Sequence, residues 1–239
     1  MTYLIIDTST QSGAVGVWRD GELVRSLAWR SRNNHTSELM PAIESVLTGA
    51  ALAPADLQGL AVARGPGGFS ALRSGLGAAK GLAFATGIPV VGVSSLEATA
   101  YPFRGLGYPV CAIIEAGREA VAWASFVTTS EGWHRRTPDK VTSVDALLAR
   151  AGRHTFFCGE GAVHHADELL QALGAKAHMV AKVGPAARLD GLAELGASRL
   201  AAGEAEPVAS LEPHYLRPPG ITPPKRARIV RQGATAKRR

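Results

Sequence analysis

The order of the apolar segments constrains the fold of this chain more than any other feature of its sequence. Residues 3–7, 12–19 and 22–30 have the pattern of strands, and Asp20-Gly21 joins the last two as a tight hairpin turn would. Alternating segments then follow: a helix at about 35–49, a strand at 59–63, a helix at about 70–86, a strand at 88–93 and a helix that begins at Ser94. A hairpin followed by alternating helices and strands predicts an α/β lobe built on a mixed sheet.

A second, weaker round of the same pattern begins after Pro102. Residues 109–116 and 119–127 predict another hairpin. The segments that follow predict a helix at 143–150, a strand at 155–161 and helices at 162–174 and 185–203. A chain of 239 residues is long enough for two lobes that each bury a core. We therefore expect lobes over 1–100 and 101–204, followed by a C-terminal segment with a basic tail over 205–239.

The composition is that of a folded globular protein. Hydrophobic residues make up 46% of the chain and charged residues 19%. No apolar run approaches the roughly 20 residues that span a bilayer, and the first ten residues do not have the pattern of a secretory signal. Cys111 and Cys158 lie far apart in apolar, strand-like runs, so we expect two buried thiols in a reducing cytoplasm.

The positive charge is concentrated at the C-terminus. Residues 225–239 contain seven Lys and Arg residues and no acid, so a formal net charge of +6 leaves the rest of the chain at −1. Such a tail either contacts the phosphates of a nucleic acid or is a solvated end without a specific partner. If it contacts RNA, the candidate residues are Lys225, Arg226, Arg228 and Arg231.

Two turns have residues that suit phosphate. Asp7, Thr8 and Ser9 follow the first strand, where hydroxyl and backbone N–H groups could contact phosphate oxygens and Asp7 could orient a Mg²⁺-bound water. A second turn contains Gly65, Gly67 and Gly68 before a helix, although it matches neither a P-loop nor a Rossmann fingerprint. The alternatives are an Asp/Ser turn and a tight glycine turn.

The helix after the glycine turn is rich in small residues. Gly75, Ala78, Ala79 and Gly81 predict a face that another backbone can approach closely, with apolar cover from Leu72, Leu76, Leu82 and Ala83. Glycine costs about 1 kcal/mol in a helix interior, so close packing explains its use better than catalysis does. Whether the partner is internal or a second protein is left open by the pattern.

The histidines do not form a recognisable metal motif. No two of them are spaced four residues apart, and His164 and His165 would point about 100° from each other on a regular helix. We therefore expect no metal site, and we expect His35 to be a local hydrogen-bonding residue. No G-x-S-x-G nucleophile turn is present either, so the residues alone indicate no catalytic set.

Four stretches in this order carry a resemblance to a known family: YLIIDTST, NHTSELMPAI, RGPGGFSALRSGLGAAKGLA and VVGVSSLEATA. Together with LEPHYLRPP at 211–219, they resemble the TsaB family of tRNA threonylcarbamoyladenosine biosynthesis proteins, a glycoprotease-like branch of the actin and sugar-kinase superfamily. The resemblance is strong over the first hundred residues and loose between 101 and 204. The sequence departs from the family at Gly68, Ser70 and Ala71, and has Glu115-Ala116-Gly117-Arg118 where the family has Asp-Ala-Arg.

The resemblance implies a two-lobed, actin-like (ribonuclease H-like) α/β fold with mixed sheets flanked by helices. It implies a cytoplasmic, non-catalytic subunit that holds no cofactor of its own and supports the catalytic paralogue TsaD and the ATPase TsaE in modifying the adenosine beside the tRNA anticodon. The family pairs with TsaD through helices that correspond to about 35–49 and 70–86. The expected partner-interface residues are Leu39, Met40, Ile43, Val46, Leu47, Leu72, Gly75, Leu76, Ala79 and Leu82. A nucleotide site, or its vestige, would use the two turns at Asp7–Ser9 and Gly65–Gly68, and the isolated chain is expected to self-associate through an exposed apolar helix face.

Two other functions fit the residues. An ATP-dependent phospho- or carbamoyltransferase would work from the cleft of the actin-like fold, with Glu115 as the second acidic residue beside Asp7. A metallopeptidase would need a cluster of metal ligands, which the sequence does not display.

Overall fold

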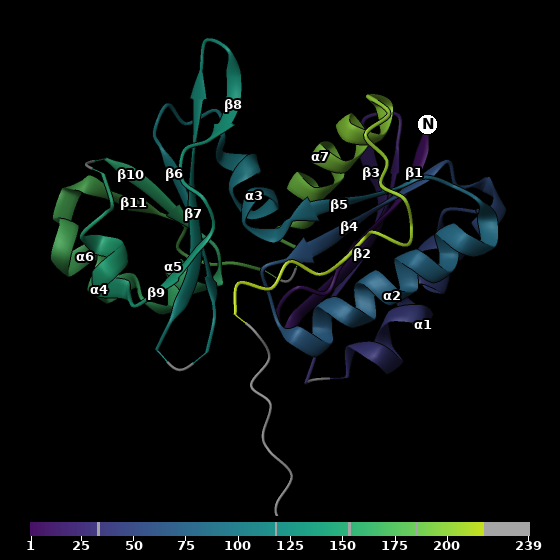
Figure 1. Cartoon of the computed structure of the whole chain (residues 1–239), viewed down its shortest axis with the longest axis horizontal. Helices are drawn as coiled ribbons and strands as arrows, with labels where there is room; N and C mark the ends of the chain where they lie inside the picture. The colour runs from purple at the N-terminus through teal and green to yellow at the C-terminus, as the bar shows by residue number, and fades with distance from the viewer. Residues whose placement is uncertain (33, 118, 153, 185, 218–239) are drawn as a thin grey trace, which may run out of the picture.

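The chain folds into two lobes, each built on one mixed sheet (Figure 1). The computed structural model describes residues 1–217 except 33, 118, 153 and 185. The predicted α/β class and the two-lobed, actin-like arrangement of mixed sheets flanked by helices are confirmed.

The first sheet contains the strands predicted from the N-terminal pattern. Its elements are β1 (Thr2–Asp7), β2 (Ser12–Arg19), β3 (Glu22–Arg30), α1 (His35–Gly49), β4 (Gly59–Gly65), α2 (Phe69–Thr86), β5 (Val90–Ser94) and α3 (Ser95–Ala100). The strand order is β3-β2-β1-β4-β5, antiparallel from β1 to β3 and parallel from β1 to β5. We call this sheet and the helices packed on it lobe 1.

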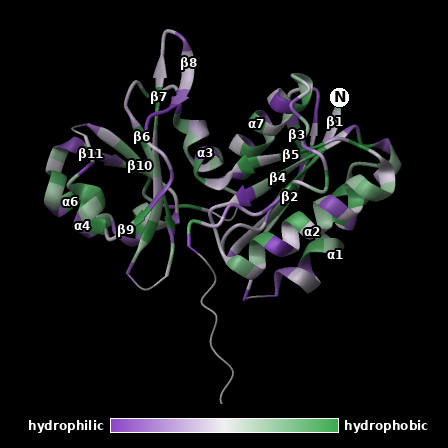
Figure 2. Cartoon of the chain, viewed as in Figure 1, coloured by the Kyte–Doolittle hydropathy of each residue, from purple (hydrophilic) through white to green (hydrophobic). Residues whose placement is uncertain are grey.

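Alternate residues of β1 point into two different cores of lobe 1. Leu4 and Ile6 face α1 and α2, whereas Tyr3 and Ile5 face α7 (Leu189–Ala201) on the other side of the sheet. Both sets are buried, as expected for a sheet covered by helices on each face. Figure 2 shows hydrophobic residues on the strands of both sheets and on the helices that cover them.

The second sheet repeats the topology of the first. Its elements are β6 (Val110–Glu115), β7 (Val121–Thr129), β8 (Gly132–Arg135), β9 (Lys140–Thr142), α4 (Val144–Leu148), β10 (Thr155–Cys158), α5 (Glu160–His164), α6 (Ala166–Leu173) and β11 (Ala177–Met179). Short 3₁₀ helices lie at Pro54–Asp56, Tyr101–Phe103 and Gly174–Lys176. The order β8-β7-β6-β10-β11, with β9 added beside β7, matches β3-β2-β1-β4-β5 strand for strand and in direction. We call this unit lobe 2.

The two lobes exchange their last helices. Helix α3 ends the first round of the pattern, but its Leu96 and Ala100 are buried in a core with β6, β7 and β10 of lobe 2, while its Ala98 packs in the lobe 1 core beside α7. Helix α7 ends the second round and packs on the sheet of lobe 1. The predicted boundary at residue 204 is therefore wrong for α7, and the C-terminal segment also returns to lobe 1, where Glu206 pairs with Val90 and Leu211 is buried.

No helix within the described ranges is long and apolar enough to cross a membrane. Cys111 and Cys158 are both buried and unpaired, as predicted for the thiols themselves.

Candidate functional site

The turn after β1 is buried between the two lobes. Asp7 and Ser9 have no exposed surface, and Asp7 Oδ1 accepts hydrogen bonds from the Ser9 backbone N–H at 2.8 Å and from Ser9 Oγ at 2.6 Å. These are the contacts of an Asp/Ser turn, in which the side chain fixes the backbone that follows it. One carboxylate oxygen of Asp7 is thus committed within the turn.

Arg188 occupies the second carboxylate oxygen. This residue directly precedes α7 and is only 2% exposed, and its Nε donates to Asp7 Oδ2 at 2.8 Å. Its other nitrogens donate to both carboxylate oxygens of Glu160 at 2.7 Å and to Thr10 Oγ1 at 2.7 Å. We call Asp7, Ser9, Thr10, Glu160 and Arg188 the interlobe cluster, because it joins the ends of β1, α5 and α7.

The electrostatics of the interlobe cluster favour permanent pairing. Burial lowers the pKa of Arg188, but the carboxylates of Asp7 and Glu160 more than offset this and raise it above its ordinary value. The guanidinium therefore stays charged, and its planar fork directs Nε to Asp7, Nη1 to Glu160 and Nη2 to Thr10. Separating the buried guanidinium from its carboxylate partners would leave buried charges unpaired, which is energetically costly. The interlobe cluster therefore holds the lobes together at this point.

The glycine loop packs on the turn instead of standing open. A Cβ on Gly67 would collide with the carbonyl oxygen of Ser9, and the same oxygen accepts the Gly68 N–H at 2.8 Å. Thr8 Oγ1 donates to the carbonyl of Ala71 in the first turn of α2 at 2.6 Å. Gly65 has a φ of +114°, which favours glycine, and its backbone lies against the His214 carbonyl.

The six residues expected at a nucleotide site are therefore brought together, but their polar groups are directed at one another. Neither carboxylate oxygen of Asp7 lacks a partner, and the loop N–H of Gly68 is bonded to Ser9. These contacts agree with the turn alternative, and nucleotide binding at these residues stays a prediction.

The predicted partner-interface residues are largely wrong, because most of them face the core of lobe 1. The buried members are Leu39, Ile43, Val46, Leu47, Leu72, Gly75, Leu76 and Ala79. A Cβ on Gly75 would collide with Thr8 Oγ1, so this glycine serves internal packing between α2 and the β1 turn. Leu82 is partly buried, and only Met40, at 49% exposure, lies largely on the outside.

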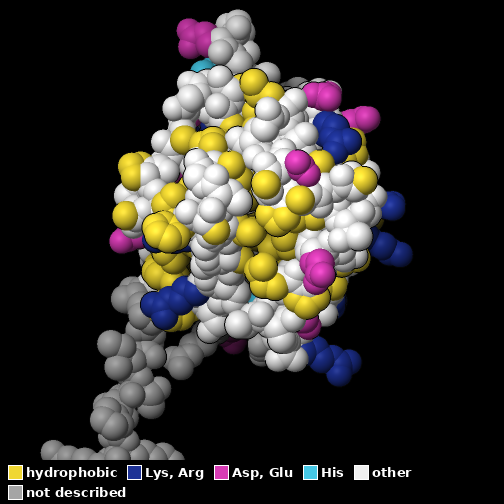
Figure 3. Space-filling model, turned by 90° about the vertical axis from the view of Figure 1, so that its right-hand side faces the viewer, with side chains coloured by type: hydrophobic (Ala, Val, Ile, Leu, Met, Phe, Trp, Pro, Cys, Tyr) yellow, Lys and Arg dark blue, Asp and Glu magenta, His cyan; other side chains and the backbone are white. Residues whose placement is uncertain are grey.

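The outer sides of α1 and α2 form a different surface. The two helices lie side by side, joined near their N-termini by a Thr36–Ser74 hydroxyl contact at 3.0 Å. The exposed small and apolar residues on them, which we call the two-helix face, are Met40, Pro41, Gly77, Gly81, Phe84 and Ala85. Phe84 is 86% exposed, and a Cβ at Gly77 or Gly81 would meet nothing within 4 Å. Figure 3 shows hydrophobic side chains across the middle of the side that lobe 1 turns outward, with most charged side chains nearer its edge.

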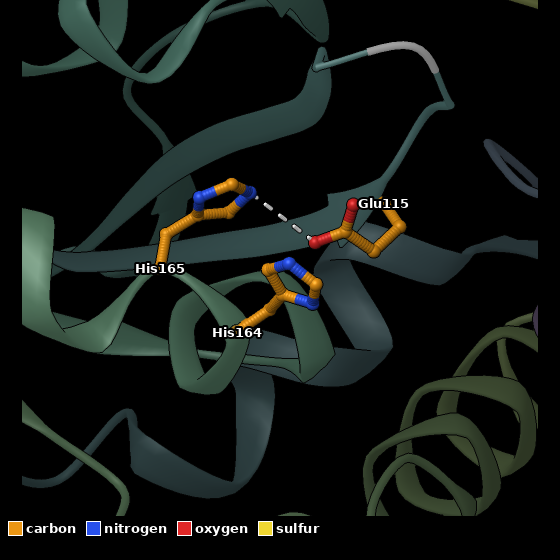
Figure 4. Close-up of side chains that lie close together, drawn as sticks. All are labelled: Glu115, His164 and His165. Atoms are coloured by element: carbon orange, nitrogen blue, oxygen red, sulfur yellow. Dashed lines mark ion pairs between the residues drawn. The ribbon is translucent and has the colours of Figure 1, made fainter.

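The prediction that His164 and His165 point about 100° apart on one regular helix is wrong. His164 ends α5 and His165 links it to α6 with φ −101° and ψ 25°, so the two residues do not lie on one regular helix. Together with Glu115 at the end of β6, they place their ligand atoms within 4.8 Å of one another (Figure 4). His35 is buried, and its Nε2 contacts the Thr10 carbonyl at 2.8 Å, which is a contact across the lobe and not a local one.

Two members of the interlobe cluster, Arg188 and Glu160, were not predicted from the sequence. Neither residue belongs to a recognised motif. The only signal is that Glu160 follows a strand and a glycine, where side chains gather at the end of a sheet.

The candidate tRNA contacts of the basic tail lie outside the described residues, so they stay a prediction. These residues are Lys225, Arg226, Arg228 and Arg231.

Comparison with known proteins places the chain among close relatives in sequence and fold. Residues 30–217 match the family model described as TsaD: tRNA N6-adenosine threonylcarbamoyltransferase. The tRNA threonylcarbamoyladenosine biosynthesis protein TsaB of Bacillus subtilis is 31% identical, over 91% of this chain and 94% of its own length. The TsaB of Escherichia coli is also 31% identical, over 91% of this chain and 95% of its own length.

A solved structure confirms the fold. YeaZ from Pseudomonas aeruginosa superposes with a TM-score of 0.74 at 27% identity, covering 90% of this chain and 99% of that one. Because the two TsaB relatives are 31% identical over 91% of this chain, the protein belongs to the TsaB family of tRNA threonylcarbamoyladenosine biosynthesis proteins.

Proposed function

We propose that this chain is a non-catalytic subunit in the synthesis of N6-threonylcarbamoyladenosine in tRNA, and that it works by docking a larger TsaD-type relative on the two-helix face. A TsaE-type ATPase joins the pair, and tRNA meets the assembly. Because the complex acts on tRNA, we place the protein in the cytoplasm.

The observation that carries the docking proposal is the pair of glycines at Gly77 and Gly81. Each costs about 1 kcal/mol of helix stability relative to alanine, and neither is required by contacts inside the chain, since a Cβ there would meet nothing within 4 Å. The presence of glycine in these helix positions therefore needs a reason other than helix stability. On an exposed face beside Met40 and Phe84, that reason is the close approach of a second backbone.

The charge pattern of this surface supports a protein partner over a solvated face. Among the exposed residues of α1 and α2, only Glu44 and Arg73 are charged. Protein interfaces are depleted of charge at their centre and enriched in aromatic residues and methionine. The same face could pair with a second copy of the chain when the partner is absent, as expected for an exposed apolar patch.

The interlobe cluster supports the non-catalytic part of the proposal. An active cleft would need Asp7 free to orient a metal-bound water, but Arg188 and Ser9 use both of its oxygens. The role of this cluster is to fix the lobes, and the chemistry then belongs to the partner.

Size-exclusion chromatography with light scattering tests the docking directly. The chain is mixed with the TsaD-type protein of the same organism, and a heteromeric peak is expected. Gly77→Arg and Gly81→Arg should each abolish it, because a long charged side chain prevents close approach. Gly105→Arg is the matched control, since this glycine is also exposed and open but lies away from the face. Separate peaks for the unaltered chain, with tRNA and ATP present, would contradict the proposal.

ATP hydrolysis by the isolated chain distinguishes the transferase alternative. We expect no turnover above the background of an Asp7→Asn variant. Turnover that the unaltered chain shows and this variant loses would favour a phospho- or carbamoyltransferase acting from the cleft.

The basic tail is a separate component of the proposal. Removing residues 225–239 should weaken tRNA binding by the assembled complex and flatten its salt dependence, because fewer counterions are released. Binding that is unchanged in strength and salt slope would show that the tail has no role in it.

A further inference from the structure

Glu115, His164 and His165 form a cluster that the docking function does not use. Glu115 ends β6, and the two histidines lie at the junction of α5 and α6. Figure 4 shows both imidazole rings on the side of the Glu115 carboxylate. The ligand atoms of all three residues lie within 4.8 Å of one another.

The distance between His165 and Glu115 suits two ligands of one ion. His165 Nε2 lies 3.4 Å from Glu115 Oε1. Zinc binds nitrogen and oxygen ligands at about 2.0–2.2 Å in a tetrahedron, which places neighbouring ligand atoms about 3.3–3.5 Å apart. These two atoms are therefore already spaced as zinc requires, and the ligand atom of the exposed His164 side chain lies within 4.8 Å of both.

A second carboxylate orients His165 for this role. Glu168 Oε1 lies 3.0 Å from His165 Nδ1, within hydrogen-bond distance of the ring nitrogen that a metal on Nε2 would leave free. His165 Nε2, on the other side of the ring, faces Glu115. Metal-binding histidines almost always donate their other ring N–H to a carboxylate, a carbonyl or water in this way.

We propose that Glu115, His164 and His165 bind one transition-metal ion of the Zn²⁺ type, with Glu168 as the positioning residue. Two imidazoles and one carboxylate select a borderline metal such as zinc over Mg²⁺ or Ca²⁺, which prefer all-oxygen sites. The fourth position faces solvent, since 43% of the Glu115 side chain is exposed.

The ion would tie the end of β6 to α5. Helix α5 also carries Glu160, which holds Arg188 in the interlobe cluster. A metal here would therefore stiffen the lobe 2 side of the junction. This inference is independent of the docking proposal, because none of its residues lies on the two-helix face.

Calorimetric titration of ZnCl₂ into untagged, chelator-treated protein tests the site. We expect one ion bound per chain by the unaltered protein and loss of that binding in His164→Gln, His165→Gln and Glu115→Gln. Glu168→Gln should weaken binding by about tenfold or more, as for other residues that orient a metal ligand. His134→Gln is the matched control, an exposed histidine on β8 whose removal should leave the titration unchanged.

Thermal unfolding provides a readout that does not depend on activity. Zn²⁺ should raise the melting temperature of the unaltered protein and of His134→Gln, but not that of the His164→Gln/His165→Gln double variant, because only a folded-state site stabilises by mass action. The proposal is wrong if the double variant keeps one-to-one binding, or if the unaltered protein takes up no more zinc than the double variant does.

Discussion

The two lobes have the same strand order, yet the carboxylates at the end of their first strands differ in exposure and in the residues that surround them. In lobe 1, Asp7 ends β1 with no exposed surface, held by Ser9 and Arg188. In lobe 2, Glu115 ends β6 at the same topological position, is 43% exposed and lies beside His165. The carboxylate at this shared position is therefore buried and paired in lobe 1 but exposed in lobe 2.

The exchanged helix explains the difference. Arg188 enters lobe 1 because α7, although late in the chain, packs on the first sheet and carries this arginine to the end of β1. At the end of β1, the chain therefore has a buried ion pair. Function in this protein therefore depends on the residues that surround the strand ends and not on the topology that the two lobes share.

Removing the guanidinium should have the largest effect. Arg188→Met leaves the buried carboxylate of Asp7 without its partner, so we expect the free energy of unfolding to fall by about 3–5 kcal/mol. Urea denaturation measures this. Arg188→Met combined with Asp7→Asn should recover part of the loss, because the fully buried charge of Asp7 is gone and only Glu160, whose side chain is 28% exposed, lacks its partner.

The surface pair of Arg104 and Glu194 is the control for that experiment. Its side chains are 38% and 36% exposed, so Arg104→Met should cost no more than about 1 kcal/mol. Equal losses at Arg104 and Arg188 would show that the interlobe cluster is no more than a solvated ion pair.

The inner side of α2 should tolerate change less well than its outer side. Gly75→Val places methyl groups against Thr8, and we expect a loss of about 1–3 kcal/mol from overpacking. Circular dichroism during urea unfolding measures it. Stability equal to that of the unaltered chain would mean that Gly75 is free to face a partner after all.

The outer glycines should respond in the opposite direction. Gly77→Ala and Gly81→Ala should each raise the free energy of unfolding by about 0.5–1 kcal/mol, since alanine has the better helix propensity and meets no neighbour. The same variants should weaken binding to the TsaD-type partner. If stability rises while binding is unaffected, close backbone approach is not the reason for these glycines.

The thiols of lobe 2 offer a smaller test of how tightly that lobe is packed. Burial raises the pKa of Cys111 to about 12 and also raises that of Cys158. An ordinary thiol has a pKa of about 8.5, so it is partly ionised at pH 8, whereas these two remain neutral. Native protein at pH 8 should therefore not react with a disulfide reagent such as DTNB, and both thiols should react in guanidinium. Rapid reaction of the native protein would indicate an open lobe 2.

Much of the fold was predictable from local patterns. The Asp20-Gly21 hairpin, the strands beside it and the helix bounds near 35–49 and 70–86 follow from turn chemistry and periodicity, which are properties of short segments. The exchange of α3 and α7 was not predictable in this way. An apolar helix face shows that it is buried, but not which sheet covers it.

The site was predictable only in part, for the same reason. The Asp7 turn and the glycine loop are adjacent as expected, but Arg188 reaches them from 181 positions along the chain. The interface residues were wrong because the most apolar positions of α1 and α2 pack inside the lobe. Gly75 is buried whereas Gly77 is exposed, and the helical periodicity of the sequence alone does not reveal this difference.

The most direct test of the account is threonylcarbamoylation of tRNA by the complex reconstituted with two variants of this chain. Asp7→Asn/Arg188→Met, the cleft variant, removes the buried Asp7–Arg188 ion pair, and Gly77→Arg/Gly81→Arg, the face variant, blocks the two-helix face. Circular dichroism checks that both variants fold. We expect that the cleft variant still supports modification and that the face variant does not. The opposite result, with modification lost in the folded cleft variant and kept in the face variant, would contradict it.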